Sequence, residues 1–223
     1  MLGIDNSDIY NLDLHTMTWT VRKEAKPEEL DSIDEHTTWA HGDSIYVFGG
    51  NIYGFKSNKL FAFNTKSGKW ETKNTTNAPP ERSSHSAIIK DGKMYIFGGK
   101  DIENNKLGDF WVYDITSNEW NQIKFEEDEG PISRSGHSTG VFKNFIVIYG
   151  GIHELTQELS DMYLYDTTRN SWMMVFEEEH SPVYKQQSHH SSFSQSGKLS
   201  KFLEFFLIWN HNKFSYSERQ KQS

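Results

Sequence analysis

Short apolar runs separated by polar turns fill the chain between residues 8 and 177. Three of these runs, at 45–48, 94–97 and 145–149, are continuous and each stops at a pair of glycines. Because a strand covered on both faces reads as an unbroken apolar run, and Gly, Asp, Asn and Ser bound these runs, the pattern predicts buried β-strands. We therefore expect an all-β fold.

The runs belong to a unit that is repeated along the chain. His36, His85 and His137 each stand 13 positions before a glycine doublet. Segments 8–13, 59–64, 109–114 and 161–166 align without a gap, and a tryptophan follows each segment six residues later. The repeated residues are Gly49, Gly50, Gly98, Gly99, Gly150 and Gly151, with Trp19, Trp70, Trp120 and Trp172. A period of roughly 50 residues indicates propeller blades.

This combination of a glycine doublet with a spaced tyrosine and tryptophan resembles the kelch repeat family, over residues 7–177. The resemblance implies a β-propeller of four-stranded blades. We expect full repeats at 36–73, 80–124 and 131–177, a partial blade of third and fourth strands at 1–22, and a degenerate partial repeat and tail at 182–223. The predicted fold is thus an incomplete kelch-like propeller. One alternative is that 183–209 completes the partial blade at 8–22 and closes a ring of four.

The repeated glycines and tryptophans have structural interpretations. Glycine is favoured where φ must be positive or where a side chain would block the close approach of two backbones. Tryptophans at a fixed blade position supply large aromatic areas, which we expect to fill the space between blades.

Composition excludes several classes of function. The net charge of −8 in 223 residues disfavours nucleic-acid binding, which requires lysine and arginine to displace phosphate counterions. The chain has no cysteine, so disulfides, thiolate metal sites and cysteine nucleophiles are excluded. We find neither a leader nor an apolar run near the length of a membrane span, so we expect a cytosolic or nuclear protein, with the cytoplasm favoured, and no membrane partner.

The sequence offers little support for catalysis. His36, His85 and His137 allow an alternative in which they converge on a metal ion, but a histidine before the first strand is also part of the repeat. Galactose-oxidase-like propellers need a crosslinked cysteine, and the iron-ligand motif of nitrile-specifier-like propellers is missing. We expect no enzyme, no metal and no cofactor. A kelch-like enzyme with a degenerate site and a truncated non-functional product remain as alternatives.

Binding of another protein or a peptide segment is the favoured function. Antiparallel connectivity places the second-to-third-strand loops and the inter-blade connections at one end, where we expect the binding surface. Glu126, Glu127 and Glu129 lie in one such connection and predict a basic partner, although charged loops are also often merely solvated. Open blade faces additionally suggest self-association.

Two arginine–serine pairs precede the first strands of the second and third repeats, Arg82-Ser83 and Arg134-Ser135. In ligand-binding kelch propellers similar to this chain, Arg and Ser at this point face the channel opening and hold acidic peptides. The resemblance therefore implies that these four residues bind a partner carboxylate, for which an arginine fork is suited. The alternative is that both arginines pair with acidic residues of this chain.

Overall fold

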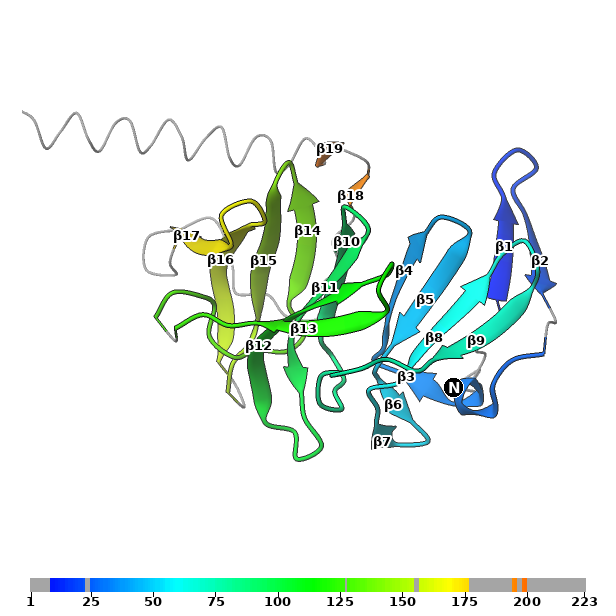
Figure 1. Ribbon diagram of the computed structural model, residues 1–223, viewed down its shortest axis with the longest axis horizontal. Coiled ribbons are helices and arrows are strands. Elements are labelled where there is room, and N and C mark those ends of the chain that lie inside the picture. Colours follow the sequence, from blue (N-terminus) through cyan, green and yellow to red (C-terminus); the bar gives the residue numbers. More distant parts are fainter. Residues whose placement is uncertain are drawn as a thin grey trace, which may run out of the picture.

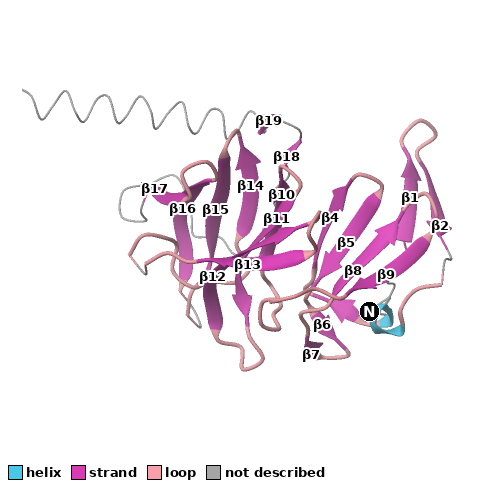
Figure 2. Ribbon diagram, in the orientation of Figure 1, coloured by secondary structure: helices cyan, strands magenta, loops and turns pink. Residues whose placement is uncertain are grey.

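The computed structural model describes residues 9–22, 25–126, 128–154, 157–176, 194–195 and 198–199. These residues form a series of antiparallel sheets, which confirms the predicted all-β class (Figure 2). The helical structure in this part of the chain is the 3-10 turn η1 (Glu28–Asp31). No helix in the described ranges is long and apolar enough to cross a bilayer.

Three sheets are four-stranded blades in which consecutive strands are neighbours. The first blade contains β4 (Thr37–His41), β5 (Ser44–Phe48), β8 (Leu60–Asn64) and β9 (Lys69–Lys73). The second contains β10 (Ser86–Lys90), β11 (Lys93–Lys100), β12 (Lys106–Asp114) and β13 (Glu119–Ile123). The third contains β14 (Ser138–Phe142), β15 (Phe145–Ile152), β16 (Glu158–Asp166) and β17 (Ser171–Phe176). Their first strands β4, β10 and β14 are neighbours, so the blades are arranged side by side (Figure 1).

A two-stranded sheet lies at each end of this series. The hairpin β1 (Ile9–Asp13) and β2 (Thr18–Arg22) stands beside the first blade, where Nη1 of Arg22 donates a 2.9 Å hydrogen bond to the carbonyl of Thr65. The pair β18 (Ser194–Gln195) and β19 (Lys198–Leu199) lies beside β14, which also contacts β10.

The glycine doublets lie at the end of the second strand of each blade, on the side where the longer loops connect the strands. In the second and third blades the strand continues through the doublet with a shift of register, whereas in the first blade it is interrupted. There, β3 (Ile33–Asp34), β6 (Asn51–Ile52) and β7 (Phe55–Lys56) form a separate small sheet, seen at the lower edge of Figure 1. We call this side of the molecule the loop end.

Both conformation and space require glycine in the doublets. Gly50 has φ +85°, and a Cβ placed on it would lie 2.4 Å from the carbonyl oxygen of Asp34. The N–H of Gly50 also donates a 2.8 Å hydrogen bond to the carbonyl of Arg82 in the turn that precedes the next blade. The doublet therefore lets two backbones approach and joins consecutive blades.

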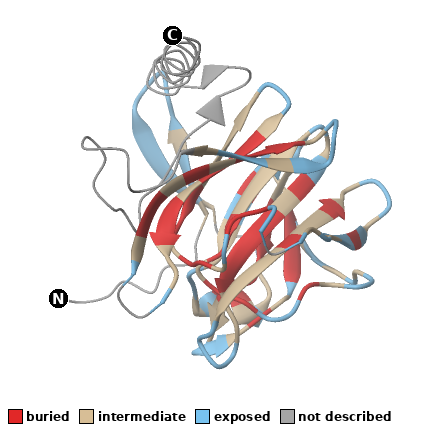
Figure 3. Ribbon diagram, turned by 90° about the vertical axis from the view of Figure 1, so that its left-hand side faces the viewer, coloured by how far each residue is buried: buried red, intermediate tan, exposed pale blue. Residues whose placement is uncertain are grey.

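The apolar core lies between the blades and appears as the buried centre of each sheet in Figure 3. Trp120 is fully buried against Phe48 of the preceding blade, and Trp70 and Trp172 are half-buried. Trp19 differs from the expectation, since 65% of it is exposed. Its hairpin lacks the first two strands of a blade among the described residues, so no second sheet layer covers the indole.

The turn between the third and fourth strands explains another repeated residue. At its first position Asp13, Asn64, Asp114 or Asp166 accepts hydrogen bonds through Oδ1 from the backbone N–H groups two and three residues later. Asp and Asn are favoured in turns because their short side chains can bond to the nearby backbone in this way.

Candidate functional site

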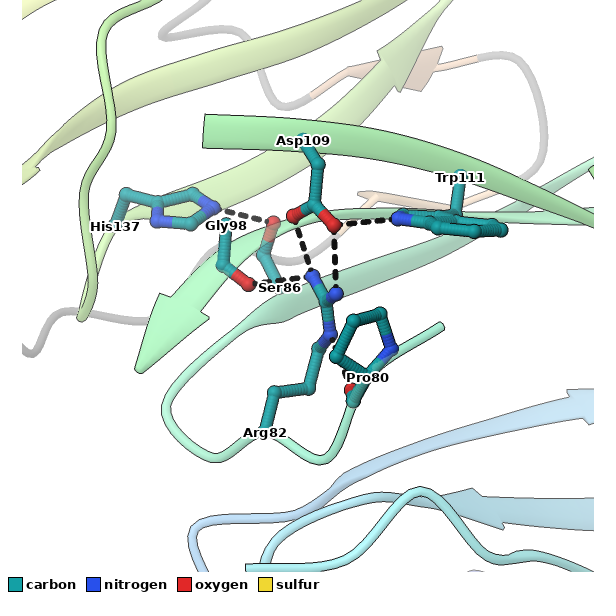
Figure 4. Close-up of polar contacts among 7 residues, drawn as sticks. All are labelled: Pro80, Arg82, Ser86, Gly98, Asp109, Trp111 and His137. Atoms are coloured by element: carbon teal, nitrogen blue, oxygen red, sulfur yellow. Dashed lines mark hydrogen bonds and ion pairs between the residues drawn. The ribbon is translucent and has the colours of Figure 1, made fainter. Parts of the chain in front are cut away.

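Arg82 lies in the turn before β10 and is completely buried. Its Nη1 and Nη2 each donate a 2.7 Å hydrogen bond to a carboxylate oxygen of Asp109. Nη1 also donates to the carbonyl of Gly98 and Nε to that of Pro80, both at 3.1 Å. Figure 4 shows the guanidinium group among these acceptors, with the indole of Trp111 donating to the same carboxylate.

Arg134 repeats this arrangement in the third blade. It is fully buried and donates to both carboxylate oxygens of Asp161, and also to the carbonyls of Gly150 at 3.0 Å and Ile132 at 3.1 Å. The geometry corresponds to the alternative in which the arginines pair with acidic residues of this chain. A carboxylate of this chain fills each fork, which gives Arg82 and Arg134 a structural contact, and their contact with a partner stays a prediction.

The repeated histidines join consecutive blades. Nε2 of His85 is 2.7 Å from Oγ1 of Thr37 in β4, and Nε2 of His137 is 2.7 Å from Oγ of Ser86 in β10. Burial, with a smaller contribution from the charge of Arg82, holds the pKa of His85 well below its ordinary value. The described ranges contain no group of histidine and acidic side chains that could hold a metal ion. These histidines therefore serve the packing of the blades.

The turns before the first strands, 34–36, 83–85 and 135–137, lie next to one another at the loop end. We call them the inner turns. Ser84 donates a backbone hydrogen bond to Glu35, and Gly136 donates one to Ser84, both at 3.1 Å. These three residues have φ of +50°, +54° and +63°. The inner turns thus form a continuous hydrogen-bonded surface across three blades.

The carboxylate of Glu35 is bound by hydroxyl groups of the next blade. Its Oε2 accepts hydrogen bonds from Oγ of Ser83 at 2.8 Å and from Oγ of Ser84 at 2.6 Å. Partial burial acts to raise the pKa of Glu35, but these two bonds and the charges of Lys100 and Lys56 outweigh it, so the pKa lies below its ordinary value. Glu35 is therefore ionised at neutral pH.

Ser135 occupies the position in the third blade that Ser83 occupies in the second, but no carboxylate of the described residues lies beside it as Glu35 lies beside Ser83. Only 1% of it is exposed, and its Oγ has no hydrogen-bond partner in the described part of the chain. The residue equivalent to Glu35 is here Ser84, whose side chain is bound to Glu35 itself. A buried hydroxyl without a partner loses about 1–3 kcal/mol of hydration, so an acceptor supplied by a ligand would be stabilising.

Each blade ends in a row of directly opposed residues at the loop end. A row contains one inner-turn residue, the residue that follows the glycine doublet, and the residue of the next strand that lies opposite the latter. Directly opposed residues share one face of a sheet. The rows are Asp34–Asn51–Lys56, Ser83–Lys100–Lys106 and Ser135–Ile152–Glu158. The first row is mixed in charge, the second is basic and the third pairs an apolar with an acidic residue.

A hollow of about 810 Å³ lies between the start of β12, the end of β13 and the connection that follows β13. Glu126 and Glu129 line it, and Oε2 of Glu129 accepts a 3.3 Å hydrogen bond from the N–H of Glu126. The apolar part of its wall includes Ile123, Phe125 and Ile132. Glu127, which the sequence groups with these acids, lies outside the described residues. This hollow can accept a long side chain with an apolar stem and a positive charge.

Comparison with known proteins agrees with the blade geometry. A model of the KLHDC2/KLHL20/DRC7 Kelch-repeats domain matches residues 3–202. The chain belongs to the Kelch-repeat family. It is 28% identical over 208 residues to tip elongation aberrant protein 3 of Schizosaccharomyces pombe, covering 78% of this Kelch chain and 18% of that protein.

Two mammalian relatives also match the Kelch chain. Kelch domain-containing protein 1 of Mus musculus is 30% identical over 155 residues, covering 66% of this chain and 36% of the relative. Kelch domain-containing protein 3 of Homo sapiens is 31% identical over 165 residues, covering 69% of this chain and 42% of the relative. The Kelch chain therefore spans less than half of the length of each of these three relatives.

The sequence-based site omitted several residues of the loop end. The sequence did not single out Lys100 or Lys106, and it did not indicate that Glu35 binds Ser83 and Ser84. A signal was present in the repeat, because the position after each doublet changes from Asn51 to Lys100 to Ile152 while the doublet itself is constant. Variation at this position shows that the packing of the blades does not require one residue type there.

Proposed function

We propose that this Kelch chain is a non-catalytic, cytoplasmic protein-interaction module that binds another protein or a peptide segment through its loop end. One observation carries the proposal. The positions that pack the blades repeat the same residues, whereas the rows at the loop end differ in charge from blade to blade. Because packing needs the same residues in every blade and specific recognition needs different ones, this contrast favours a binding surface.

The hollow beside Glu126 and Glu129 supports a basic segment as one part of the partner. A positive side chain entering there meets the carboxylates of Glu126 and Glu129 and an apolar wall, although Lys124 also lines the hollow. Attraction between opposite charges raises the association rate, and dissolved salt screens it. We therefore infer that association through this hollow is fast at low ionic strength and slows as salt is added.

Selection of peptides from a random display library on the purified chain tests the proposal. We expect binders rich in Lys and Arg, and an association rate roughly tenfold lower for the Glu126→Lys/Glu129→Lys variant. The control is Asp43→Lys, an exposed acid in the turn between β4 and β5 at the opposite end. Equal rates for the loop variant and the control at low salt would contradict the proposal, provided that circular dichroism shows both variants folded.

A further inference from the structure

Lys100 and Lys106 lie directly opposite each other in the second row, at the ends of β11 and β12. Both are half-buried. Like charges in directly opposed positions of an antiparallel pair are destabilising. The equivalent pair in the third blade is Ile152 and Glu158, which has no such conflict. The repulsion is therefore a property of this blade and not a requirement of the fold.

A third lysine adds to this positive charge. Lys56 occupies the position in the first blade that Lys106 occupies in the second, and its Nζ donates a 2.7 Å hydrogen bond to Oδ1 of Asn104 in the loop between β11 and β12. Burial lowers the pKa of Lys106, and the charges of Lys100 and Lys56 lower it further. The three ammonium groups are thus near enough to repel one another.

Several lysines of the described residues form ion pairs, whereas Lys100 and Lys106 do not. Carboxylates lie within ion-pair distance of Lys26, Lys59, Lys66, Lys73, Lys90 and Lys93. Within the described residues, neither Lys100 nor Lys106 has such a carboxylate. The nearby acids bind other groups, since Glu35 accepts from two serine hydroxyls and Asp101 accepts from Asn105 and from the backbone of Glu103. Glu35 and Asp101 therefore offset part of the positive charge from a distance, but no carboxylate among the described residues forms an ion pair with Lys100 or Lys106.

We propose that Lys56, Lys100 and Lys106 form a binding site for an anionic side chain of a partner protein, either a carboxylate or a phosphoryl group. An anion placed among the three lysines removes their mutual repulsion and accepts charge-assisted hydrogen bonds. Strand ends hold the backbones of all three residues, so binding has to order only their side chains. The inference rests on the proposed function only in taking the loop end as the binding end.

The lysine site gives the partner a direction. Its anionic side chain lies over the first and second blades, and its basic segment lies over the hollow at Glu126 and Glu129, between the second and third blades. A partner segment with an acid at one end and a base at the other fits in one orientation. The reverse orientation places like charges together, which disfavours it.

Three synthetic peptides test the lysine site. They share one glycine–serine sequence and differ only at the centre, which is phosphoserine, Asp-Asp or Asn-Asn. Lysines are labelled by reductive ¹³C-methylation, which keeps their charge, and single Lys→Gln variants assign the resonances. We expect the Lys100 and Lys106 resonances to shift with the phosphoserine or the Asp-Asp peptide, which identifies the preferred anion, and to stay unchanged with Asn-Asn.

Matched variants complete the test. The Lys100→Gln/Lys106→Gln variant should bind the anionic peptide at least roughly tenfold more weakly. Lys93→Gln, at the other end of β11 and paired with Asp114, should bind it like the wild type. The absence of any lysine shift up to about 5 mM peptide, or equal affinity of the double variant, overturns the inference. Glu126→Lys/Glu129→Lys should retain the anionic peptides, so failure of the lysine site is separable from failure of the proposed function.

Discussion

Asp109 fills the guanidinium fork of Arg82, which lies 27 residues earlier in the chain, through two hydrogen bonds of 2.7 Å. The pair ties the residue just before an inner turn to β12, the third strand of the same blade. Arg134 and Asp161 are separated by the same 27 residues and make the same contact. The two ion pairs therefore hold the inner turns, and with them the rows at the loop end, in place on the blades.

Replacement of these arginines should lower the free energy of unfolding but leave the affinity for a partner peptide unchanged. We expect Arg82→Ala to lower the free energy of unfolding by about 3 kcal/mol, because the partly buried carboxylate of Asp109 and two backbone carbonyls lose their donor. Urea unfolding measures the change. Arg169→Ala is the control, since that side chain is 82% exposed and 3.8 Å from Asp166, and a loss under about 1 kcal/mol is expected. Equal losses in the two variants would contradict the structural role.

Partner affinity separates the two interpretations of the arginines. The double variant Arg82→Ala/Arg134→Ala should keep the affinity of the folded protein for a peptide selected on the wild type, measured at a temperature where the variant remains folded. The reason is that neither guanidinium group is exposed. Weaker binding by the folded double variant, without a change in the rows, would support the predicted contact between these arginines and a partner carboxylate.

Gly50→Ala tests the close approach of the inner turn to the doublet. Alanine there has to adopt φ +85° and places its Cβ 2.4 Å from the carbonyl oxygen of Asp34. Gly42→Ala is the control, because its φ is +57° but nothing lies within 4 Å of the new Cβ. We expect Gly42→Ala to cost about 1 kcal/mol in thermal or urea unfolding, and Gly50→Ala at least about 2 kcal/mol more. Similar losses for both would show that the backbone conformation alone matters.

Burial of His85 makes stability depend on pH. Its pKa in the folded protein is lowered from the ordinary 6.5, so the unfolded chain binds the proton more tightly. The folded protein therefore has its full stability, as far as His85 is concerned, above the pKa of this histidine in the unfolded chain. The free energy of unfolding falls as the pH drops below that pKa, because the unfolded chain takes up the proton. We expect the free energy of unfolding in urea to decrease from about pH 7 to about pH 5, with a shallower slope for His85→Gln. An identical slope in that variant would exclude His85 as the cause.

Exposed apolar residues at the two ends of the series predict self-association of the isolated chain. They include Tyr10, Trp19 and Val21 in β1 and β2, and Met173 and Met174 in β17. Sheet faces of this kind are normally covered. Light scattering should detect species larger than a monomer, and Trp19→Ser should reduce them more than Ile102→Ser, which alters an equally exposed loop residue. A monodisperse monomer with a sharp thermal transition would contradict the prediction.

The sequence by itself determined the class of fold and the repeat, because both depend on local spacing. Continuous apolar runs, turn residues and glycine doublets recur in register, and each reports the conformation of its own short segment. The need for positive φ at a residue such as Gly50 is local in this sense. The sequence also shows that an arginine recurs before the first strand of the second and third blades. It does not show which acidic residue each of these arginines binds.

Only the tertiary structure decided which side chains meet. Glu35 binds Ser83 across 48 residues, and Lys56 reaches Asn104 across 48 residues, because adjacent blades bring their loop ends together. The pairing of Lys100 with Lys106 depends on the register beyond the bulge at the doublet, and the exposure of Trp19 depends on which sheet covers its hairpin. A local pattern carries no information on these contacts, since their free energy arises from groups that only the packing of blades places side by side.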